Sequence, residues 1–595
     1  MRPEDARSLV ELFFEQADRR ADKPFVWSKV DGTYRSQSWR EVAEQVARLA
    51  GGLKELGVQP GDRVTLVSEN RPEWLIADLG IMAAGAITVP TYTTNTERDH
   101  LHILENSGAK GAVVSTQQLA RAFLPAAHQS DPLQFVITLC DPNITQQISA
   151  DIHLWADVLA RSDATVDEIS GATAGFQRTD TACIIYTSGT GGAPKGVMLH
   201  HGAILHNCAS AIDVLTEIGV DDNVFLSFLP LSHAYEHSAG QFLPIATGAQ
   251  IYYAEGIDKL AANMEEARPT IMVVVPRLFE LMRSRITRAI EKEGGLRARL
   301  FAKALTLGKK RFEAPETLTV IERIQNFLLD WLVRRKVRKR FGGRLRALVS
   351  GGAPLNPEVG DFFAALGLPL MQGYGQTEAG PVISVNRPSA PKMHTVGPPL
   401  KGTGIRIAED GEILVHGELV MQGYWRDQTA TDEALRDGWL HTGDIGHIDQ
   451  DGHLEITDRK KDIIVSDKGE NISPQRVEGM LALQPEIAQV MVYGDQRPYL
   501  VGLVVPDAEW LAEWAEAHGK PDGLADLADD AELAQALDDA VSRVNRRLSN
   551  VEKVRRFAVA REAFTIENEQ MTPTMKVRRH VISAAYREAI EGLYG

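Results

Sequence analysis

The sequence predicts an α/β protein whose large N-terminal domain holds mixed and parallel sheets flanked by helices, followed by a small C-terminal α+β domain. Three observations support this fold class. A chain of 595 residues is too long for one hydrophobic core, and an apolar fraction of 44% supplies large cores. Short apolar runs alternate with helical patterns through about the first 450 residues, which is typical of βαβ units. A charged segment at 459–462 then marks a change in the chain.

The first elements follow from short apolar patterns. Residues 63–67 predict a strand and residues 72–82 a helix, while 86–89 and 110–114 predict two more strands. The apolar run 182–186 predicts a buried strand that leads into a glycine-rich loop. Because strands and helices alternate, we expect the strands to be largely parallel.

The charged segment divides the chain, since a compact region follows it to the last residue. We therefore place an N-terminal domain at 1–458 and a C-terminal domain at 459–595.

Charge is unevenly distributed along the chain. The net charge of −16 makes nucleic acid a poor partner. Residues 277–346, by contrast, hold twenty Lys and Arg against seven Asp and Glu, a surplus of +13 that we interpret as a basic helical insertion. Within it, the apolar residues of 327–333 precede the basic run 334–340, a pattern typical of a helix on an anionic membrane. The second interpretation is a solvated helix face paired with the acidic remainder.

Composition also bears on location and redox chemistry. Cys140, Cys183 and Cys208 have neither metal-ligand spacing nor an even count, so they predict small buried residues rather than disulfides. The longest uncharged apolar run, 79–89, is too short to span a bilayer, and the first residues lack the apolar core of a signal peptide. We therefore expect a cytoplasmic protein, with peripheral contact at the inner face of the membrane as a further expectation.

The segment 186–197, Tyr-Thr-Ser-Gly-Thr-Gly-Gly-Ala-Pro-Lys-Gly-Val, concentrates the groups that hold a polyphosphate. Hydroxyl groups donate to anionic oxygens, glycines let backbone N–H groups approach them, and a lysine adds a mobile charge. These residues are Thr187, Ser188, Gly189, Thr190, Gly191, Gly192 and Lys195. Because Gly196 follows Lys195, the segment does not match the P-loop of nucleotide-binding proteins. A flexible surface turn is the alternative.

Further segments hold side chains suited to a nucleotide. The ring of Tyr374 can stack on a base, Thr377 can donate to a phosphate, and Glu378 offers the hard oxygen that Mg²⁺ prefers. Asp444 can accept from both ribose hydroxyls, and Arg459 can bind the same sugar. The alternatives are core packing for Tyr374 and a surface salt bridge for Asp444 or Arg459.

Five segments, in this order, resemble the motifs of the adenylate-forming superfamily of acyl-CoA synthetases, luciferases and adenylation domains. They are 186–197, 350–354, 372–378, 439–444 and 458–462. The resemblance covers nearly the whole chain and is closest to long-chain fatty acyl-CoA synthetases. It implies that Gly352 and Ala353 line the adenine site with Tyr374, and that the C-terminal domain is a mobile lid.

The resemblance also implies a reaction. A carboxylate attacks the α-phosphate of ATP to give an acyl-adenylate and pyrophosphate, with Mg²⁺ bound by Glu378 and Thr187. The thiol of CoA then displaces AMP. The segment 570–579 resembles the family's last motif and makes Lys576 the catalytic lysine, whose charge stabilises the developing negative charge. Thr377 and Glu378 complete this part of the catalytic set.

Between the two half-reactions the lid of such an enzyme rotates. The resemblance implies a hinge at Lys461. Lys576 would then leave the site, and the loop 468–471 would enter beside the pantetheine channel. In that loop Gly469 suits the close approach of a ligand.

The acyl substrate is indicated by the segment 229–237, Leu-Pro-Leu-Ser-His-Ala-Tyr-Glu-His, which resembles the long-chain version of the family's acyl-site motif. The resemblance implies that His233 shapes the acyl and nucleotide pocket rather than acting as a base. It also implies that Tyr235 or His237 gates the acyl tunnel. A satisfied core histidine is the alternative for His233.

We therefore predict a long-chain fatty acid:CoA ligase that uses ATP and Mg²⁺. Its expected partners are a long-chain fatty acid, CoA, an anionic membrane reached through 327–346, and a second copy in a homodimer. Two other functions stay open. A fatty acyl-AMP ligase would stop at the adenylate or load a carrier protein, although the short spacing from Asp444 to Arg459 leaves no room for the insertion typical of those relatives. A non-catalytic lipid-binding scaffold would have no need of Lys576.

The sequence departs from the family pattern at two positions. Gly191 stands where a second threonine is usual, which removes one hydroxyl from the phosphate loop. Glu418 stands where a proline is common. Neither change removes a residue that is expected to be essential.

Overall fold

The computed structural model describes residues 1–143, 148–187, 193–572 and 576–595. It confirms the elements predicted near the start of the chain. These are strands β3 (Arg63–Val67), β4 (Ile87–Thr91), β5 (Gly111–Val114) and β8 (Thr181–Thr187), with helix α3 (Pro72–Ala83) between the first two. Strands β3, β4 and β5 are parallel, and β8 joins them through a parallel pairing with β4.

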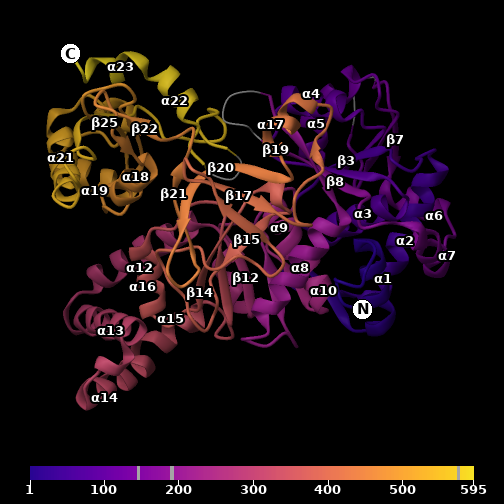
Figure 1. Cartoon of the computed structure of the whole chain (residues 1–595), viewed down its shortest axis with the longest axis horizontal. Helices are drawn as coiled ribbons and strands as arrows, with labels where there is room; N and C mark the ends of the chain where they lie inside the picture. The colour runs from indigo at the N-terminus through magenta and orange to yellow at the C-terminus, as the bar shows by residue number, and fades with distance from the viewer. Residues whose placement is uncertain (144–147, 188–192, 573–575) are drawn as a thin grey trace.

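Two eight-stranded sheets form most of the N-terminal part of the described chain (Figure 1). The strands of the first sheet, in spatial order, are β15 (Val382–Val385), β14 (Leu370–Gly375), β13 (Ala347–Ser350), β12 (Ile271–Val274), β10 (Val224–Ser227), β11 (Gln250–Tyr253), β1 (Pro24–Val30) and β2 (Thr33–Ser38). The run from β14 to β11 and on to β1 is parallel. Its strands therefore end at one edge, where α/β sheets usually bind ligands.

The second sheet has the order β18 (Gly423–Tyr424), β9 (Lys195–His200), β8, β4, β3, β5, β6 (Phe135–Thr138) and β7 (Asp151–Leu154). Strands β8 and β9 are antiparallel and flank the predicted phosphate loop. Strand β18 comes from much later in the chain and pairs with β9. The sheet therefore brings the segment around Tyr424 next to that loop.

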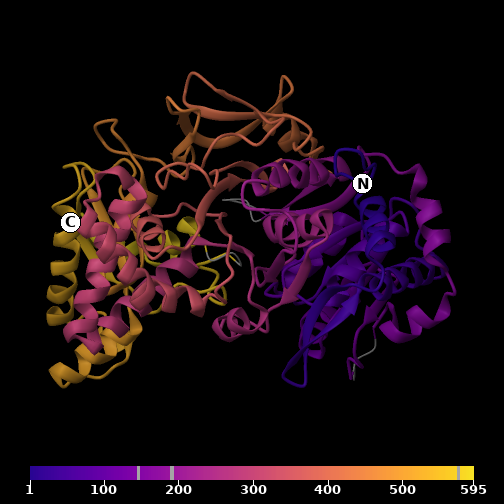
Figure 2. The ribbon, with the colours of Figure 1, turned by 90° about the horizontal axis from the view of Figure 1, so that it is seen from below.

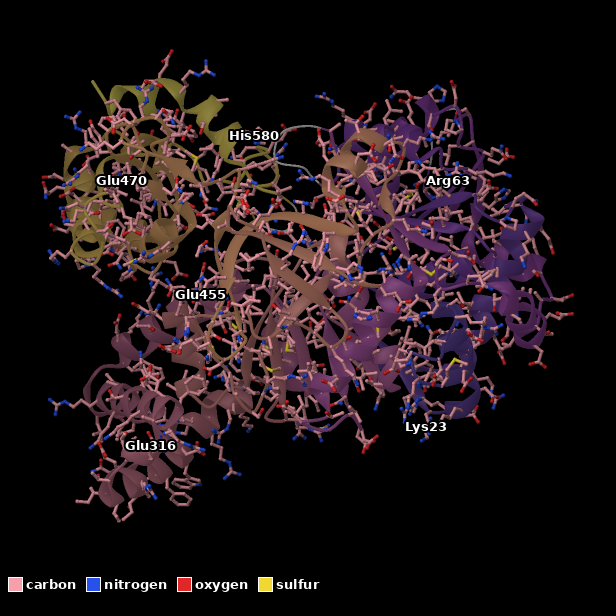
Figure 3. All side chains as sticks on the ribbon, viewed as in Figure 1. Lys23, Arg63, Glu316, Glu455, Glu470 and His580 are labelled. Atoms are coloured by element: carbon pink, nitrogen blue, oxygen red, sulfur yellow. The ribbon has the colours of Figure 1, made fainter. Side chains whose placement is uncertain are left out.

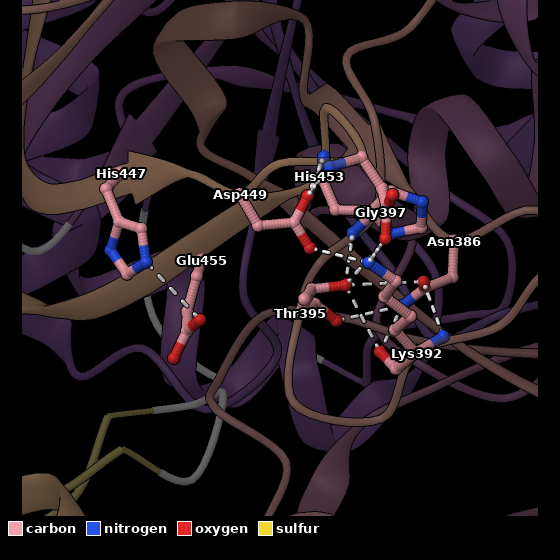
Figure 4. A network of polar contacts seen from close by, with 9 residues as sticks. Asn386, Lys392, Thr395, Gly397, His447, Asp449, His453 and Glu455 are labelled. Atoms are coloured by element: carbon pink, nitrogen blue, oxygen red, sulfur yellow. Dashed lines mark hydrogen bonds and ion pairs between the residues drawn. The ribbon is translucent and has the colours of Figure 1, made fainter. Parts of the chain in front are cut away.

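A third, antiparallel sheet lies on one side of the molecule (Figure 2). Its strands are β16 (Gly404–Ile407), β17 (Glu412–His416), β19 (Leu435–Arg436), β20 (Trp439–Ile448) and β21 (Leu454–Arg459). A polar network ties its β20–β21 turn to the preceding loop (Figure 4). In it Lys392 Nζ lies 2.7 Å from Asp449 Oδ2 and 2.5 Å from Asp451 Oδ2, and Thr395 Oγ1 lies 3.2 Å from His453 Nδ1.

Several helices of the N-terminal part, including α1, α2, α4 and α5, begin at a side-chain cap. Ser38 and Glu41, for example, form a capping box that starts α2. Trp39 and Trp74, on α2 and α3, are fully buried in the main core. The helices are α1 (Leu9–Arg20), α2 (Trp39–Glu55), α3, α4 (Glu97–Ser107), α5 (Gln117–Gln129), α6 (Trp155–Arg161), α7 (Val166–Ala172), α8 (His201–Leu215), α9 (Ala234–Glu236), α10 (Leu243–Thr247), α11 (Leu260–Ala267), α16 (Pro357–Ala365) and α17 (Gln428–Ala434).

The predicted basic insertion is helical and forms a lobe at the lower left of Figure 1. Its elements are α12 (Pro276–Glu293), α13 (Gly295–Glu313), α14 (Val320–Leu329), the π-helical turn η4 (Asp330–Arg334) and α15 (Arg335–Arg340). The structure separates the members of the basic run 334–340. Arg334 is 1% exposed and cannot contact a membrane, whereas Arg338 is half-buried and pairs with Asp330 at 2.7 Å.

The C-terminal domain holds two small sheets, one of β22 and β23 and one of β24, β25 and β26, and its own core. Its strands are β22 (Ile464–Val465), β23 (Asn471–Ile472), β24 (Ile487–Tyr493), β25 (Leu500–Pro506) and β26 (Val554–Val559). Its helices are α18 (Pro474–Leu481), α19 (Ala508–His518), α20 (Leu524–Leu527), α21 (Ala531–Asn545), α22 (Arg579–Ala585) and α23 (Arg587–Gly592). Across the described ranges, we find no helix with the length and apolar character needed to cross a bilayer.

Candidate active site

The predicted site residues lie where strands end. His233 follows β10, Gly352 follows β13, and Thr377 opens the 3₁₀ turn η5 (Thr377–Ala379) after β14. These strands belong to the parallel part of the first sheet, so the three residues lie along one edge. In the second sheet Thr187 ends β8, and Lys195 is its partner in register at the start of β9.

Asp444 is buried on β20 between two hydrogen-bond donors. Tyr374 Oη donates to its Oδ2 at 2.6 Å, and Arg459 Nε donates to its Oδ1 at 3.1 Å. The backbone N–H of Asp444 donates to Thr442 Oγ1 at 3.1 Å. Burial raises the pKa of Tyr374, and the Asp444 carboxylate adds to this effect. The tyrosine therefore stays protonated and keeps the carboxylate in one orientation.

Glu378 is linked to the phosphate-loop strand by Tyr424. The hydroxyl of Tyr424 donates to Glu378 Oε1 at 2.9 Å. Lys195 Nζ lies 5.2 Å from the centroid of the same ring and 3.7 Å from Asp427 Oδ2. The two large sheets thus meet at this hydrogen bond, and the carboxylate of Glu378 lies near the end of the loop.

Five residues of the predicted phosphate loop lie outside the described residues: Ser188, Gly189, Thr190, Gly191 and Gly192.

Lys576 enters this cluster from the C-terminal domain. Burial lowers its pKa to about 8, and the charge of Arg459 adds to this effect, while Asp444 and Glu378 oppose it. Charges act on a pKa across several ångströms and need not be in contact. The lysine, the arginine and the two carboxylates lie within electrostatic range of one another and form an electrostatic cluster.

His233 begins α9, where its Nδ1 accepts a hydrogen bond from the backbone N–H of Tyr235 at 3.2 Å. Burial lowers the pKa of His233 to about 3, with a further contribution from the charge of Lys576. The ring is therefore neutral at pH 7 and a poor base. The tunnel-gate expectation does not fit His237, because its Nε2 lies 2.8 Å from Asp78 Oδ2 and both side chains are fully buried.

The remaining predicted residues differ in position. Gly352 has a φ of +82°, in the left-handed region that favours glycine, and Ala353 next to it is exposed. Gly469 has a φ of +80° in an exposed turn of the C-terminal domain. Figure 3 shows its neighbour Glu470 on the outer part of that domain, away from the cluster. The structure therefore does not bring Gly469 to the other site residues.

Sequence reasoning gave no role to Tyr424 and Asp427. Both lie about 230 residues after the phosphate loop and reach it through the β18–β9 pairing. They also line an open cavity of about 660 Å³ together with Arg426. The signal in the sequence was weak, since an aromatic residue and an acid near a predicted turn are common in any protein.

Solved structures with this fold are adenylation domains and CoA ligases. The adenylation domain of a carboxylate reductase from Mycobacterium chelonae superposes with a TM-score of 0.77 and 20% identity, over 99% of this chain and 91% of that one. The anthranilate CoA ligase AuaEII superposes with a TM-score of 0.72 and 19% identity, over 99% of each chain. At such identities the likeness establishes the α/β fold with its smaller C-terminal domain.

Sequence comparison defines the family. The profile of the AMP-binding enzymes matches residues 13–425, and that of the AMP-binding enzyme C-terminal domain matches 461–595. The long-chain-fatty-acid–CoA ligase FadD15 of Mycobacterium bovis is 34% identical over 99% of this chain and 97% of its own. The peroxisomal long chain acyl-CoA synthetase 7 of Arabidopsis thaliana is 30% identical over 99% of this chain and 86% of its own. The chain belongs to the AMP-binding enzyme family.

Proposed function

We propose that this protein is a long-chain fatty acid:CoA ligase that works through an acyl-adenylate. The observation that supports it most is the entry of Lys576 into the cluster of Arg459, Asp444 and Glu378. A scaffold would gain nothing from placing a partly buried lysine within electrostatic range of two carboxylates. The full-length likeness to curated long-chain-fatty-acid–CoA ligases supports the same activity and the use of ATP and CoA.

In the first half-reaction, a fatty acid carboxylate oxygen bonds to the α-phosphorus of ATP, and the bond to the pyrophosphate oxygen breaks. We assign to Lys576 the stabilisation of negative charge on the α-phosphate and the carboxylate. With a pKa of about 8 the lysine is still mostly charged at pH 7. His233 and Thr377 lie at the same sheet edge, where we assign them to the acyl pocket and to a phosphate contact.

The nucleotide would lie over the ends of β13 and β14. We assign Gly352, Ala353 and Tyr374 to the adenine. The ribose hydroxyls would donate to Asp444, whose carboxylate is already oriented by Tyr374 and Arg459. Because this carboxylate is fixed before the sugar arrives, little ordering is needed on binding.

Mg²⁺ fits beside Glu378. One of its carboxylate oxygens accepts from Tyr424, and a single carboxylate with phosphate oxygens is a donor set that Mg²⁺ commonly takes. Thr187 at the start of the phosphate loop, together with Lys195, would complete the polyphosphate site. Bound Mg²⁺ would neutralise phosphate charge during the displacement. Among the described residues, no group of three or more His, Cys, Asp and Glu could hold a metal by itself.

For the second half-reaction we propose that the C-terminal domain, 459–595, rotates against 1–458 about Lys461. Lys576 would leave, and the turn with Gly469 would approach the adenylate. The thiol sulfur of CoA would then bond to the acyl carbon, and AMP would depart. The exposed position of Gly469 agrees with the pose for adenylate formation, in which Lys576 lies in the site.

The partners that we propose are a long-chain fatty acid, CoA, a second copy in a homodimer, and an anionic membrane met through residues 327–346. The protein is proposed to act in the cytoplasm and at the inner face of that membrane.

The test is mass spectrometry of the products made by the purified protein from ATP, Mg²⁺ and a panel of acids. The panel contains acetate, octanoate, palmitate, oleate and an aryl acid, each with and without CoA. We expect palmitoyl- or oleoyl-CoA, and only when CoA is present. Adenylate without any thioester would contradict the ligase and point to an acyl-AMP ligase, and no product from any acid would contradict both.

A further inference from the structure

The helical lobe exposes an apolar stripe that the basic run 334–340 does not explain. Seven large apolar side chains between residues 320 and 332 are 40–75% exposed. They are Val320, Ile321, Ile324, Phe327, Leu328, Trp331 and Leu332. Their spacing of three, four and seven residues places them on one face of α14 and η4. An amphipathic helix of this kind normally turns such a face toward a core.

The opposite face of the same helix already has its core. Leu329 is buried against Ala304 and Leu307 of α13, and Asn326 hydrogen-bonds to Arg334. The helix therefore cannot turn its apolar stripe inward. Figure 1 shows α14 at the outer tip of the lobe, away from the sheets, and Figure 3 shows the neighbouring Glu316 there as well.

The charges beside the stripe are mostly positive. Residues 320–340 hold seven Lys and Arg against two Asp and Glu. Both acids are neutralised, because Glu322 pairs with Lys310 at 2.9 Å and Asp330 pairs with Arg338 at 2.7 Å. Arg335, Lys336 and Lys339 are exposed just beyond the stripe. An apolar face next to exposed cations is complementary to a bilayer with anionic headgroups.

We propose that this stripe, residues 320–332, inserts into an anionic phospholipid bilayer, with the cations of α15 against the headgroups. A second copy of the chain fits less well, because a symmetric contact through α14 would bring the two sets of cations together. The proposal rests on the proposed function only for the reason why the protein would bind a membrane, which is that long-chain fatty acids partition into bilayers. The residues that make the main contact with the bilayer are apolar, and the arginines of the basic run do not make it.

The first test is sedimentation with vesicles of mixed phosphatidylcholine and phosphatidylglycerol. We expect the triple variant Ile324→Ser, Phe327→Ser, Trp331→Ser to lower the partition coefficient about tenfold or more at moderate salt, with loss of buried apolar area. The matched control is Val30→Ser, Ile257→Ser, Ile448→Ser, which removes exposed apolar groups outside the lobe. Equal binding by the triple variant and the wild type would overturn the proposal.

Charge and folding are tested separately. Arg335→Gln, Lys336→Gln, Lys339→Gln should reduce binding at low salt and have little effect at high salt, where screening is strong. An unchanged salt dependence would overturn the role of the cations.

A single labelled site tests insertion while the rest of the stripe stays unchanged. The Phe327→Cys variant, in a Cys140→Ser background, can bear a nitrobenzoxadiazole dye. Its emission should shift to the blue with vesicles, whereas the same dye at Ile448→Cys should not.

Further assays distinguish a failure of the membrane proposal from a failure of the proposed ligase function. With oleate supplied in solution as its albumin complex and no vesicles, the Ser triple variant should make thioester at the wild-type rate. Vesicle binding through the stripe without any thioester would sustain the surface and reject the ligase. A wild-type dimer in light scattering that the triple variant abolishes, with no vesicle binding by either, would overturn the proposal in favour of a second copy.

Discussion

At the scale of single residues, the site combines the charges of one lysine, one arginine and two carboxylates. Asp444 is held by Tyr374 and Arg459, so its charge has a fixed position. Lys576 is the member that follows the proposed hinge at Lys461, and we propose that it alone leaves between half-reactions. Its substitution therefore separates the two halves of the proposed reaction.

Lys576→Ala should slow acyl-adenylate formation by about 100-fold or more, because a preorganised charge at the reacting phosphate is lost. Thioester formation from supplied acyl-adenylate should stay near the wild-type rate. Single-turnover assays of each half-reaction measure both quantities. An equal loss in the two would contradict a lid with two poses.

The pH dependence of adenylate formation follows from the same lysine. Its pKa is lowered to about 8, and only the protonated form has the useful charge. We expect kcat/KM for adenylate formation to be level below pH about 8 and to fall about tenfold per unit above it, since kcat/KM reports groups of the free enzyme. Lys576→Arg keeps its charge at all these values and should remove that fall. If kcat/KM of the Lys576→Arg variant falls with rising pH as it does in the wild type, the fall belongs to another group.

Glu236 offers a second test at this scale. It is buried within the segment 229–237, and burial raises its pKa to about 8 despite a hydrogen bond from Ser227. The folded protein therefore holds the Glu236 carboxyl in its protonated form, whereas the unfolded chain releases the proton above about pH 4.5. The free energy of unfolding of the wild type consequently decreases as pH rises from about 4.5 to about 8. Glu236→Gln removes this loss, which is about 3 kcal/mol at pH 7.

The measurement compares thermal midpoints of Glu236→Gln and wild type at about pH 5 and pH 7.5. The thermal midpoint of the variant, relative to that of the wild type, should be higher at pH 7.5 than at pH 5. Glu316→Gln, at an exposed glutamate, should change the midpoint little at either pH. An equal difference at both values would mean that Glu236 does not titrate in this range.

At the scale of elements, the lobe depends on a buried arginine. Arg334 Nη2 donates to the carbonyl of Ala304 at 2.7 Å, and Nε donates to that of Ala365 at 2.8 Å. It also bonds Asn326 Oδ1 at 2.7 Å. One guanidinium thus connects α13, α14 and α16, which explains why this member of the basic run turns inward.

Arg334→Met should destabilise the protein by about 3 kcal/mol, because several buried carbonyls lose their donor. Thermal denaturation gives the size of the effect, and limited proteolysis should locate the loosening within residues 294–340. Arg335→Met is the matched control, since the neighbouring side chain is exposed and should cost less than about 0.5 kcal/mol. Comparable destabilisation by both variants would argue against the buried network.

At the scale of the whole molecule, the lobe also contacts the C-terminal domain. Arg288 on α12 lies 2.7 Å from Asp507 Oδ1 and 2.9 Å from Glu509 Oε2, and it donates to the carbonyl of Pro485. Arg547 of the C-terminal domain pairs with Glu358. These contacts stabilise the pose in which Lys576 lies in the site.

Arg288→Glu should therefore shift the domain away from that pose. Exposed ion pairs are worth about 0.2–1 kcal/mol each, and charge reversal adds repulsion, so adenylate formation should fall about 3- to 10-fold. Thioester formation from supplied adenylate should not fall. Arg285→Glu, an exposed position on the same helix, is the control. An equal effect of both substitutions would attribute the loss to overall charge.

The sequence by itself determined the α/β class, the early strands and helix, and the family, because these depend on local periodicity and on short motifs. The predicted β3 has the observed bounds, the motif residues Tyr374 and Asp444 are hydrogen-bonded, and Lys576 lies within electrostatic range of Asp444. Only the tertiary structure decided which partners those residues have. Tyr424 reaches Glu378 by a pairing between distant strands, and no local pattern encodes such a contact.

The same limit applies to the basic lobe. The sequence determined its charge and its helical character, but arginines in a run are equivalent until the packing of neighbouring helices is known. Arg334 turns inward because three helices present carbonyl groups to it, and the apolar residues of α14 turn outward because its other face is already covered. Burial is a property of the assembled molecule, so it was decided by tertiary structure alone.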